Sequence, residues 1–131
     1  GDEVFKQLQQ TKIIIFGVGG VGSYALDCLY RTGFQNITIV DFDKFDITNQ
    51  NRQIGSDFGI DQFKVDVLKQ LYPKIKTLNL KVTPEFIYNF DFKSFDFVIG
   101  AIDDIPAKVA LAEKTWNKLI SSMGSAQQID C

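Results

Sequence analysis

Apolar residues follow two patterns along the chain, unbroken apolar runs and stripes at helical spacing. Unbroken runs of β-branched and aromatic residues are typical of strands buried inside a parallel sheet. Five strands are expected, at residues 12–16, 37–40, 77–82, 95–102 and 119–122. The strand at 77–82 differs from the others, because Leu78, Leu80 and Val82 alternate with polar residues, which is typical of a half-buried strand. Stripes with an apolar residue every third or fourth position indicate amphipathic helices. Three helices are expected, at residues 23–32, 62–72 and 106–117.

Strands and helices therefore alternate, which is typical of βαβ units with right-handed crossovers. We predict a Rossmann-like α/β fold with a doubly wound, mainly parallel sheet. The 131 residues suit a single domain. Residues 41–61 read as a long polar loop, and loops of such length are usually functional. Residues 86–95 are expected to form a short helix and turn.

The composition of the chain excludes several classes of function. The formal charge of -2 and the pI of about 5.0 exclude a basic footprint for the phosphate backbone of nucleic acid. The chain has no histidine, which excludes histidine-based nucleophile pairs and histidine metal sites within it. No apolar run approaches the roughly 20 residues of a membrane span, and no signal peptide is visible. We expect a cytoplasmic protein that makes no membrane contact.

A glycine-rich turn separates the first predicted strand from the first predicted helix. Its sequence, GVGGVG, fits the G-x-G-x-x-G pattern. The first glycine permits the tight turn, the second lets the backbone approach phosphates, and the last permits close helix packing. The N-terminus of the helix adds free amides and a partial positive charge. We predict that a nucleotide is bound by Gly17, Gly19, Gly20 and Gly22.

Asp41 ends the second predicted strand, roughly 20 residues after the glycine turn. A carboxylate in this place accepts hydrogen bonds from ribose hydroxyls in NAD sites and ATP sites alike. Asp43 is close enough in sequence to share the role. The alternative is that Asp43 is a solvated loop residue that contacts no ligand.

A polar loop and the start of the next helix supply cations. Asn49, Arg52 and Gln53 lie in the loop, where Arg52 can hold phosphate oxygens bidentately. Lys64 can add a point charge on the same phosphates. Each cation taken alone is more often a solvated surface residue. Together they favour a triphosphate over NAD, which offers no phosphate beyond those at the glycine turn.

Asp103 follows the strand at 95–102, at the same edge of the sheet as the glycine turn. A carboxylate there can hold Mg²⁺ against triphosphate oxygens. The alternative is an N-cap for the following helix, and Asp104 competes for both roles. Position favours Asp103 as the metal ligand.

The order and spacing of these motifs resemble the ThiF/MoeB/HesA and ubiquitin-activating superfamily across nearly the whole chain. The likeness is carried by GVGGVG at 17–22, DFD at 41–43, N-x-N-R-Q at 49–53, Lys64, and AIDD at 101–104. It implies that ATP and Mg²⁺ are bound by Asp41, Asn49, Arg52, Lys64 and Asp103. It further implies adenylation of a carboxylate with release of pyrophosphate. In that chemistry Arg52, Lys64 and Asp103 are the expected catalytic residues, because they would stabilise charge on the phosphates.

Within that superfamily, the chain more specifically resembles the tRNA threonylcarbamoyladenosine dehydratase family. The segments involved are GVGSYA at 20–25, TNQNRQI at 48–54, VTPE at 82–85 and AIDDIPAKVAL at 101–111. The resemblance implies ATP-dependent cyclisation of the modified tRNA base through a carboxyl adenylate. Gln127 and Cys131 depart from the expected glycine and proline.

Three hypotheses follow for function. The first is the tRNA dehydratase, the second an adenylyltransferase for a ubiquitin-like sulfur carrier, and the third an NAD- or nucleotide-binding module without adenylation. The resemblance also implies a homodimer. Members of the superfamily are about twice this length, so we expect 1–131 to be a partial ATP-binding adenylation domain. We expect this part of the protein to have impaired turnover alone.

Overall fold

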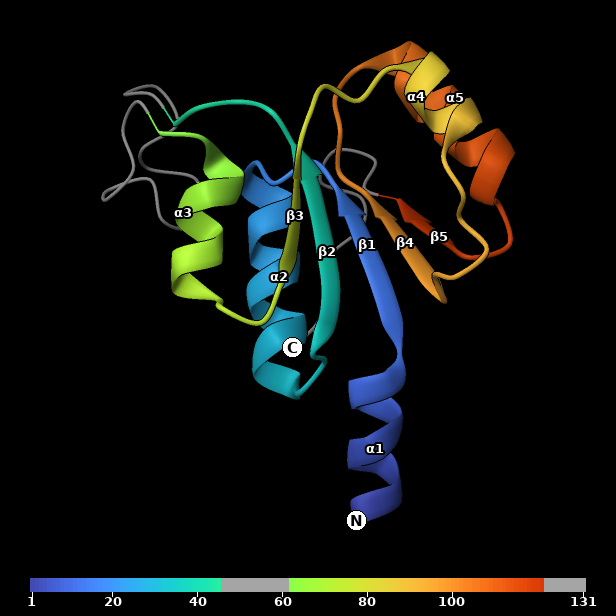
Figure 1. The fold of residues 1–131 in the computed structure, drawn as a ribbon. Helices are drawn as coiled ribbons and strands as arrows, with labels where there is room; N and C mark the ends of the chain where they lie inside the picture. The colour runs from blue at the N-terminus through green and yellow to red at the C-terminus, as the bar shows by residue number, and fades with distance from the viewer. Residues whose placement is uncertain (46–61, 122–131) are drawn as a thin grey trace.

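The chain folds around one sheet of five parallel strands in a computed structural model that describes residues 1–45 and 62–121 (Figure 1). The strands are β1 (Lys12–Phe16), β2 (Asn36–Asp41), β3 (Lys76–Asn79), β4 (Phe97–Gly100) and β5 (Leu119–Ser121). Their order across the sheet is β3-β2-β1-β4-β5. All four neighbouring pairs are parallel, for example with Ile15 opposite Ile39 and Ile99. The predicted doubly wound parallel fold is confirmed.

Helices cover both faces of the sheet. They are α1 (Asp2–Gln10), α2 (Gly20–Thr32), α3 (Lys64–Leu71), α4 (Pro84–Asn89) and α5 (Ile105–Thr115). In Figure 1, α2 and α3 lie on one side of the sheet, whereas α4 and α5 lie on the other. In the described part of the chain, no helix has the length and apolar character needed to cross a membrane.

The core divides into two apolar clusters, because successive strand residues point to opposite faces. Ile13 and Ile15 of β1 belong to the cluster under α2 and α3, while Ile14 and Phe16 belong to the cluster under α4 and α5. All four are at most 2% exposed. Burial on both faces explains why this strand is an unbroken apolar run.

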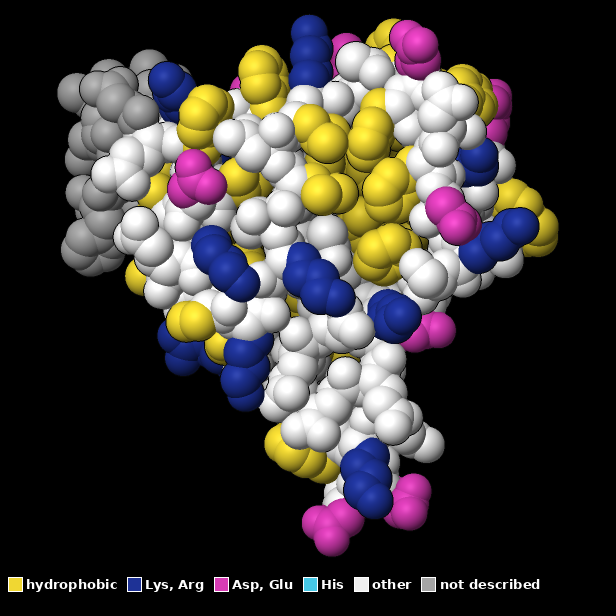
Figure 2. Space-filling model, viewed as in Figure 1, with side chains coloured by type: hydrophobic (Ala, Val, Ile, Leu, Met, Phe, Trp, Pro, Cys, Tyr) yellow, Lys and Arg dark blue, Asp and Glu magenta, His cyan; other side chains and the backbone are white. Residues whose placement is uncertain are grey.

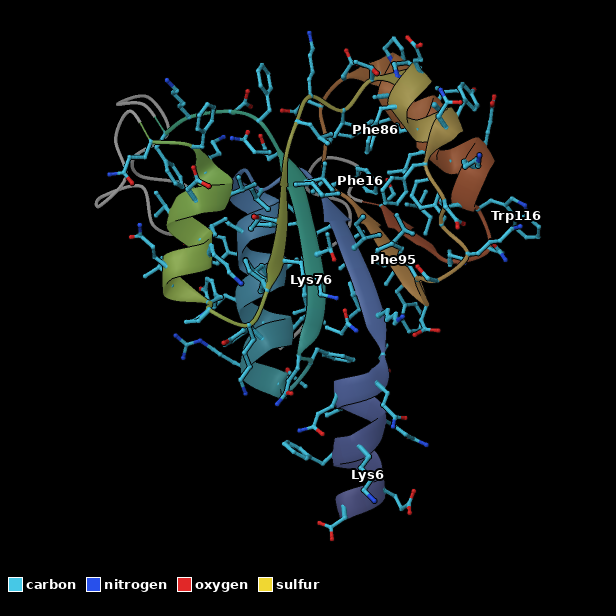
Figure 3. All side chains as sticks on the ribbon, viewed as in Figure 1. Lys6, Phe16, Lys76, Phe86, Phe95 and Trp116 are labelled. Carbon is cyan, nitrogen blue, oxygen red and sulfur yellow. The ribbon has the colours of Figure 1, made fainter. Side chains whose placement is uncertain are left out.

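Aromatic rings fill much of the second cluster. Phe16 lies 6.4 Å from Phe86 between ring centroids, and Figure 3 shows these two rings with Phe95 on the α4 side of the sheet. Leu78 at the end of β3 is only partly buried against the same cluster. Figure 2 accordingly shows apolar side chains gathered between β3 and α4 on the face in view. This cluster places α4 and α5 against β4, beside the strand ends described below.

The chain changes direction across the sheet at β1. From β1 it winds outward through β2 to β3, and it then returns to the other side of β1 to form β4 and β5. The loops after β1 and β4 therefore diverge to opposite faces. In open α/β sheets this topological switch point is where ligands bind, outside the carboxyl ends of the strands.

Several predicted boundaries need correction. The helix α1 (Asp2–Gln10), which extends away from the sheet in Figure 1, was not identified from the sequence. It was missed because it buries no residue and lacks a long apolar stripe. β3 begins at Lys76 and ends at Asn79, so residues 80–82 lie in a loop rather than in the predicted strand. Helix α2 begins at Gly20, earlier than the predicted start at Ser23, because the glycine turn leads directly into it.

A polar contact joins α2 to α3. The Tyr72 hydroxyl donates a 2.7 Å hydrogen bond to Asp27 Oδ1, which also accepts a bond of 2.9 Å from Arg31 Nε. Partial burial acts to raise the pKa of Asp27, but the hydrogen bonds from Arg31 and Tyr72 and the charge of Arg31 outweigh it and lower that pKa. Burial, then the bond to Asp27, raises the pKa of Tyr72. The contact is therefore strongest when Asp27 is ionised.

Replacing Tyr72 by phenylalanine should lower the free energy of unfolding by about 1 kcal/mol, because Asp27 loses a buried donor. A carboxyl with a lowered folded-state pKa stabilises the protein above its unfolded pKa, and that stabilisation is lost as pH falls through the folded pKa. Urea unfolding at neutral pH and at pH values below the ordinary carboxyl pKa of 3.8 measures both effects. A difference between the two proteins that stays constant down to the lowest pH would contradict the assignment to ionised Asp27.

Candidate nucleotide site

The carboxyl ends of the strands border a cleft of about 570 Å³. Its walls come from the glycine turn after β1, the end of β2, the loop after β3, and the segment from Ala101 to Asp104 after β4. Lys64 at the start of α3 and Lys108 in α5 complete the lining. The cleft therefore lies at the switch point of the sheet.

Two of the motif glycines are required by backbone contacts. Gly17 has a φ of 91°, which L-residues with a side chain rarely adopt, and its amide donates to the Val40 carbonyl at 2.8 Å. A Cβ on Gly17 would lie 2.5 Å from the Ala101 carbonyl oxygen. A Cβ on Gly22 would lie 1.8 Å from the Gly17 carbonyl oxygen. The turn can thus pack against the segment after β4 and against α2 only because these positions lack side chains.

The Asp41 carboxylate is held by backbone amides of the glycine turn and of the loop after β2. Its Oδ2 accepts a hydrogen bond of 2.8 Å from the Val18 amide, and its Oδ1 accepts one of 2.8 Å from the Asp43 amide. Each carboxylate oxygen can accept a further hydrogen bond. The arrangement fixes a carboxylate beside the turn, facing a cleft in which a diol could donate to it.

Lys64 is a buried cation. Its side chain is 5% exposed, and its Nζ lies 4.0 Å from Asp43 Oδ2 and 5.9 Å from the centroid of the Phe45 ring. The Lys64 amide donates to the Asp43 carbonyl at 2.9 Å, which ties the start of α3 to the loop after β2. Lys64 is therefore not the solvated surface residue that was the alternative. It carries a positive charge into the wall of the cleft.

The two aspartates after β4 have different environments. Asp104 is the N-cap of α5, and its Oδ2 accepts a 3.0 Å hydrogen bond from the Ala107 amide. Asp103 is exposed and lines the cleft, and its carboxylate has no hydrogen bond or ion pair within residues 1–45 and 62–121. The capping role thus belongs to Asp104, which leaves the Asp103 carboxylate available to a ligand.

The structure brings most of the predicted site residues to this one cleft. Those that line it are Gly17, Gly19, Gly20, Asp41, Asp43, Lys64 and Asp103. Gly22 supports the turn from α2. Asn49, Arg52 and Gln53 lie outside the described residues, so their roles stay predictions from sequence.

Further cleft residues were not singled out from the sequence. Lys81 and Lys108 add two cations, while Leu80, Val82 and Ile102 add apolar surface. Leu80 and Val82 were assigned to a strand that in fact ends at Asn79. Their positions after predicted strands could have identified these residues, because the loops that follow the strands of a parallel sheet share one edge of it.

Comparison with known families places this cleft in context. The model of the family described as ThiF matches residues 1–128. The chain belongs to the ThiF family. Three relatives of this ThiF chain illustrate the range of proteins that it is similar to.

The tRNA threonylcarbamoyladenosine dehydratase of Bacillus subtilis is 37% identical over 140 residues, covering 99% of this chain and 55% of the relative. A crystal structure of the Escherichia coli tRNA N6-threonylcarbamoyladenosine dehydratase in complex with ATP has a TM-score of 0.84 and 31% identity. It covers 99% of this chain and 58% of that one. The SUMO-activating enzyme subunit 2 of Dictyostelium discoideum is 36% identical, covering 82% of this chain and 17% of the relative. The ThiF chain therefore spans about half the length of the curated dehydratases that it matches.

Proposed function

We propose that residues 1–131 form the ATP-binding adenylation domain of an enzyme that activates a carboxylate as its adenylate. The proposal rests on one observation. The glycine turn, Asp41, Lys64 and Asp103 all line one cleft at the switch point of the sheet. Membership of the ThiF family and the ATP complex of a relative with the same fold support it. The proposed substrate is the threonylcarbamoyl group of modified tRNA, as in the dehydratases named above.

Each residue has a role that follows from its surroundings. The amides of Gly19 and Gly20 would donate hydrogen bonds to phosphate oxygens at the start of α2, while Gly17, whose own amide is bonded to the Val40 carbonyl, would shape the turn around the nucleotide. Asp41 would accept hydrogen bonds from the ribose hydroxyls, since the Val18 and Asp43 amides already hold it in place. Asp43 would assist Asp41 through its contact with Lys64. Lys64 would hold the phosphates and stabilise charge during transfer.

Asp103 is the proposed ligand of Mg²⁺. The described residues contain no group of three or more acidic, cysteine or histidine side chains that could hold a metal ion by themselves. Mg²⁺ commonly binds one or two carboxylates together with substrate phosphates and water, so a single free carboxylate in the cleft fits that mode. Bound there, Mg²⁺ would neutralise charge on the phosphates. Asn49, Arg52 and Gln53 would complete the phosphate site, with Arg52 as a catalytic cation.

In the proposed reaction the substrate carboxylate attacks the α-phosphate of ATP and pyrophosphate leaves. Ring closure within the activated threonylcarbamoyl group then expels AMP. The chain's part is to bind and orient the nucleotide and to stabilise phosphate charge through Lys64 and Arg52. Because the substrate is tRNA, we place the enzyme in the cytoplasm, and the family resemblance supports a homodimer.

The second candidate function is activation of a ubiquitin-like sulfur carrier. The likeness to SUMO-activating enzyme subunit 2 favours it, because that name describes a protein that activates another protein. Pyrophosphate release by the full-length protein, with threonylcarbamoylated tRNA or with a carrier ending in Gly-Gly, decides between the two. Stimulation by tRNA alone supports the dehydratase, and stimulation by the carrier alone overturns it.

Titration calorimetry tests the nucleotide itself. The chain should bind ATP·Mg²⁺ in preference to NAD, because the cleft adds cations beyond the glycine turn. Preferential binding of NAD would overturn the proposed adenylation domain and favour the third hypothesis, an NAD-binding module.

The two aspartates after β4 provide a matched pair of variants. Asp103→Ala should weaken ATP·Mg²⁺ binding about tenfold or more with little change in stability, since its carboxylate has no partner among the described residues. Asp104→Ala should instead lower the free energy of unfolding by about 1 kcal/mol through loss of the N-cap. Calorimetry and urea unfolding of both variants measure the contrast. Unchanged affinity in Asp103→Ala would remove this residue from the site.

A further inference from the structure

One half-buried cation in the wall of the cleft has no role in the proposed ATP site. Lys108 of α5 lines the cleft and is only partly exposed. Within residues 1–45 and 62–121, its ammonium group forms no hydrogen bond or ion pair. A partly buried charge is costly without a partner, so such a group is best stabilised by an anion. The cleft therefore offers a positive charge to a ligand at this position.

The surroundings of Lys108 differ from those of another lysine on the same helix. Lys114 Nζ donates a 2.6 Å hydrogen bond to the Tyr88 carbonyl, which joins α5 to α4. Asp104 precedes Lys108 by four residues, a spacing at which ion pairs form on helices. The Asp104 carboxylate instead accepts the hydrogen bond from the Ala107 amide, and it forms no ion pair with Lys108. Lys114 thus has a structural partner, whereas the charge of Lys108 is left for a ligand.

Lys108 lies across the cleft from the proposed phosphate site. Lys64 begins α3 and Lys108 lies in the first turn of α5, and Figure 1 shows these helices on opposite sides of the sheet. The glycine turn leads into α2, which lies on the same side as α3. The phosphates would therefore meet the turn amides and Lys64 on that side. Lys108 is on the other side, where Val82 and Ile102 line the cleft and pack on the second core cluster.

The proposed reaction brings a second anion into the cleft. The substrate carboxylate must reach the α-phosphate, and in phosphoryl transfer the attacking and leaving oxygens lie roughly in line. The carboxylate therefore arrives on the side away from the pyrophosphate, and the phosphate oxygens repel it. A cation on that side offsets the repulsion and holds the carboxylate by a charge-assisted hydrogen bond. Apolar surroundings strengthen such a contact, because they lower the local dielectric constant.

We propose that Lys108 binds the substrate carboxylate, that of the threonylcarbamoyl group, and holds it against the α-phosphate of ATP. The inference rests on the proposed function, because it requires a carboxylate substrate beside a bound nucleotide. During the reaction a carboxylate oxygen forms a bond to the α-phosphorus while the bond to the pyrophosphate oxygen breaks. Lys108 keeps its proton throughout and contributes charge and hydrogen bonds alone.

Binding of two tRNAs to the full-length protein tests this contact. One tRNA carries the threonylcarbamoyl group and the other lacks it, and an ATP analogue that cannot release pyrophosphate is present with Mg²⁺. Lys108→Met should reduce the preference for the modified tRNA about tenfold or more, because one hydrogen bond to a charged group is lost. Affinity for the unmodified tRNA should not change. Lys108→Glu should invert the preference, since it places two carboxylates together.

Lys114→Met is the matched control, because it removes one positive charge from the same helix outside the cleft. It should keep the preference of the unchanged protein. A preference that survives in Lys108→Met, or that falls equally in Lys114→Met, would overturn the inference. If the unchanged protein shows no preference, the proposed substrate is wrong and the inference fails with it.

Calorimetry with ATP·Mg²⁺ separates a carboxylate contact from a phosphate contact. Lys108→Met should bind ATP·Mg²⁺ like the unchanged protein, so a loss of affinity equal to that in Lys64→Met would assign Lys108 to the phosphates and overturn the inference. No ATP binding by the unchanged protein would instead contradict the adenylation domain itself.

Steady-state kinetics of pyrophosphate release give a third measurement. Loss of a contact made equally in the ground state and the transition state raises KM and leaves kcat unchanged. Lys108→Met should therefore raise the KM for modified tRNA by about tenfold or more with a smaller change in kcat. Lys108→Arg should recover most of the loss, because a guanidinium also pairs with a carboxylate. Failure of arginine to recover the KM, with unchanged thermal stability, would contradict a role based on charge.

Discussion

A Gly22→Ala variant is expected to lose the native glycine turn and nucleotide binding with it. The added Cβ would lie 1.8 Å from the Gly17 carbonyl oxygen and 2.8 Å from the Gly17 carbonyl carbon. Both are backbone atoms, so either the turn or α2 must move. We expect the free energy of unfolding to fall by about 4 kcal/mol or more, a loss seen only for severe packing or backbone conflicts. Urea unfolding and ATP calorimetry measure the two effects.

Gly100→Ala is the matched control for this substitution. Gly100 is also buried, but a Cβ there would meet Leu111 Cδ2 at 3.1 Å and Leu119 Cδ1 at 3.4 Å, the ends of flexible side chains. Those side chains can adjust, so a cost of about 1 kcal/mol is expected, with ATP binding retained. Equal costs in the two variants would mean that the contact between Gly22 and Gly17 does not constrain the turn.

The second large effect is expected from Lys64→Met. Methionine is of similar length and apolar, so it can occupy the buried position, and the 4.0 Å contact with the largely exposed Asp43 contributes little stability. The loss should therefore appear in binding rather than in folding. A hydrogen bond to a charged group contributes about 1.5–3 kcal/mol, so ATP·Mg²⁺ should bind about ten to a hundred times more weakly. Calorimetry together with a thermal unfolding curve measures both quantities.

Lys81→Met controls for the general loss of a positive charge from the cleft. Lys81 lines the same cleft but is exposed to solvent, which screens its charge. We expect its removal to weaken ATP·Mg²⁺ binding only slightly. If Lys81→Met and Lys64→Met weaken ATP·Mg²⁺ binding equally, binding depends on the total positive charge of the cleft. The specific phosphate role proposed for Lys64 would then be wrong.

The first strand and the end of the first predicted helix show what patterns along the chain can predict. The predicted bounds of the first strand, 12–16, agree with β1, because a strand buried on both faces leaves an unbroken apolar run. The helix end at Gly33 was predicted as well, and Gly33 caps α2 with a φ of 122°. Such signals are local, since they depend on a residue's own conformation or on burial of a whole segment.

Other elements are only weakly marked in the sequence, because their bounds depend on contacts with residues far away along the chain. β3 pairs with β2 only from Lys76 to Asn79, so the alternation that continues to Val82 belongs partly to a loop that packs on the second core cluster. Helix α1 was missed because it buries nothing, and hence no core pattern marks it. In both cases the apolar pattern alone does not distinguish a strand or helix from a packed loop or an exposed segment.

The sequence by itself determined the parallel fold class, the position of the glycine turn and the set of polar residues available for a site, because buried runs and glycine spacing are properties of the chain. Tertiary structure alone decided how those polar residues are used. Asp103 and Asp104 are adjacent in sequence, yet only the start of α5 makes one an N-cap and leaves the other to the cleft. Lys64 is one lysine among several, and only packing against Asp43 and Phe45 buries it. Burial and hydrogen bonding depend on which segments meet in space, and the folded sheet brings them together.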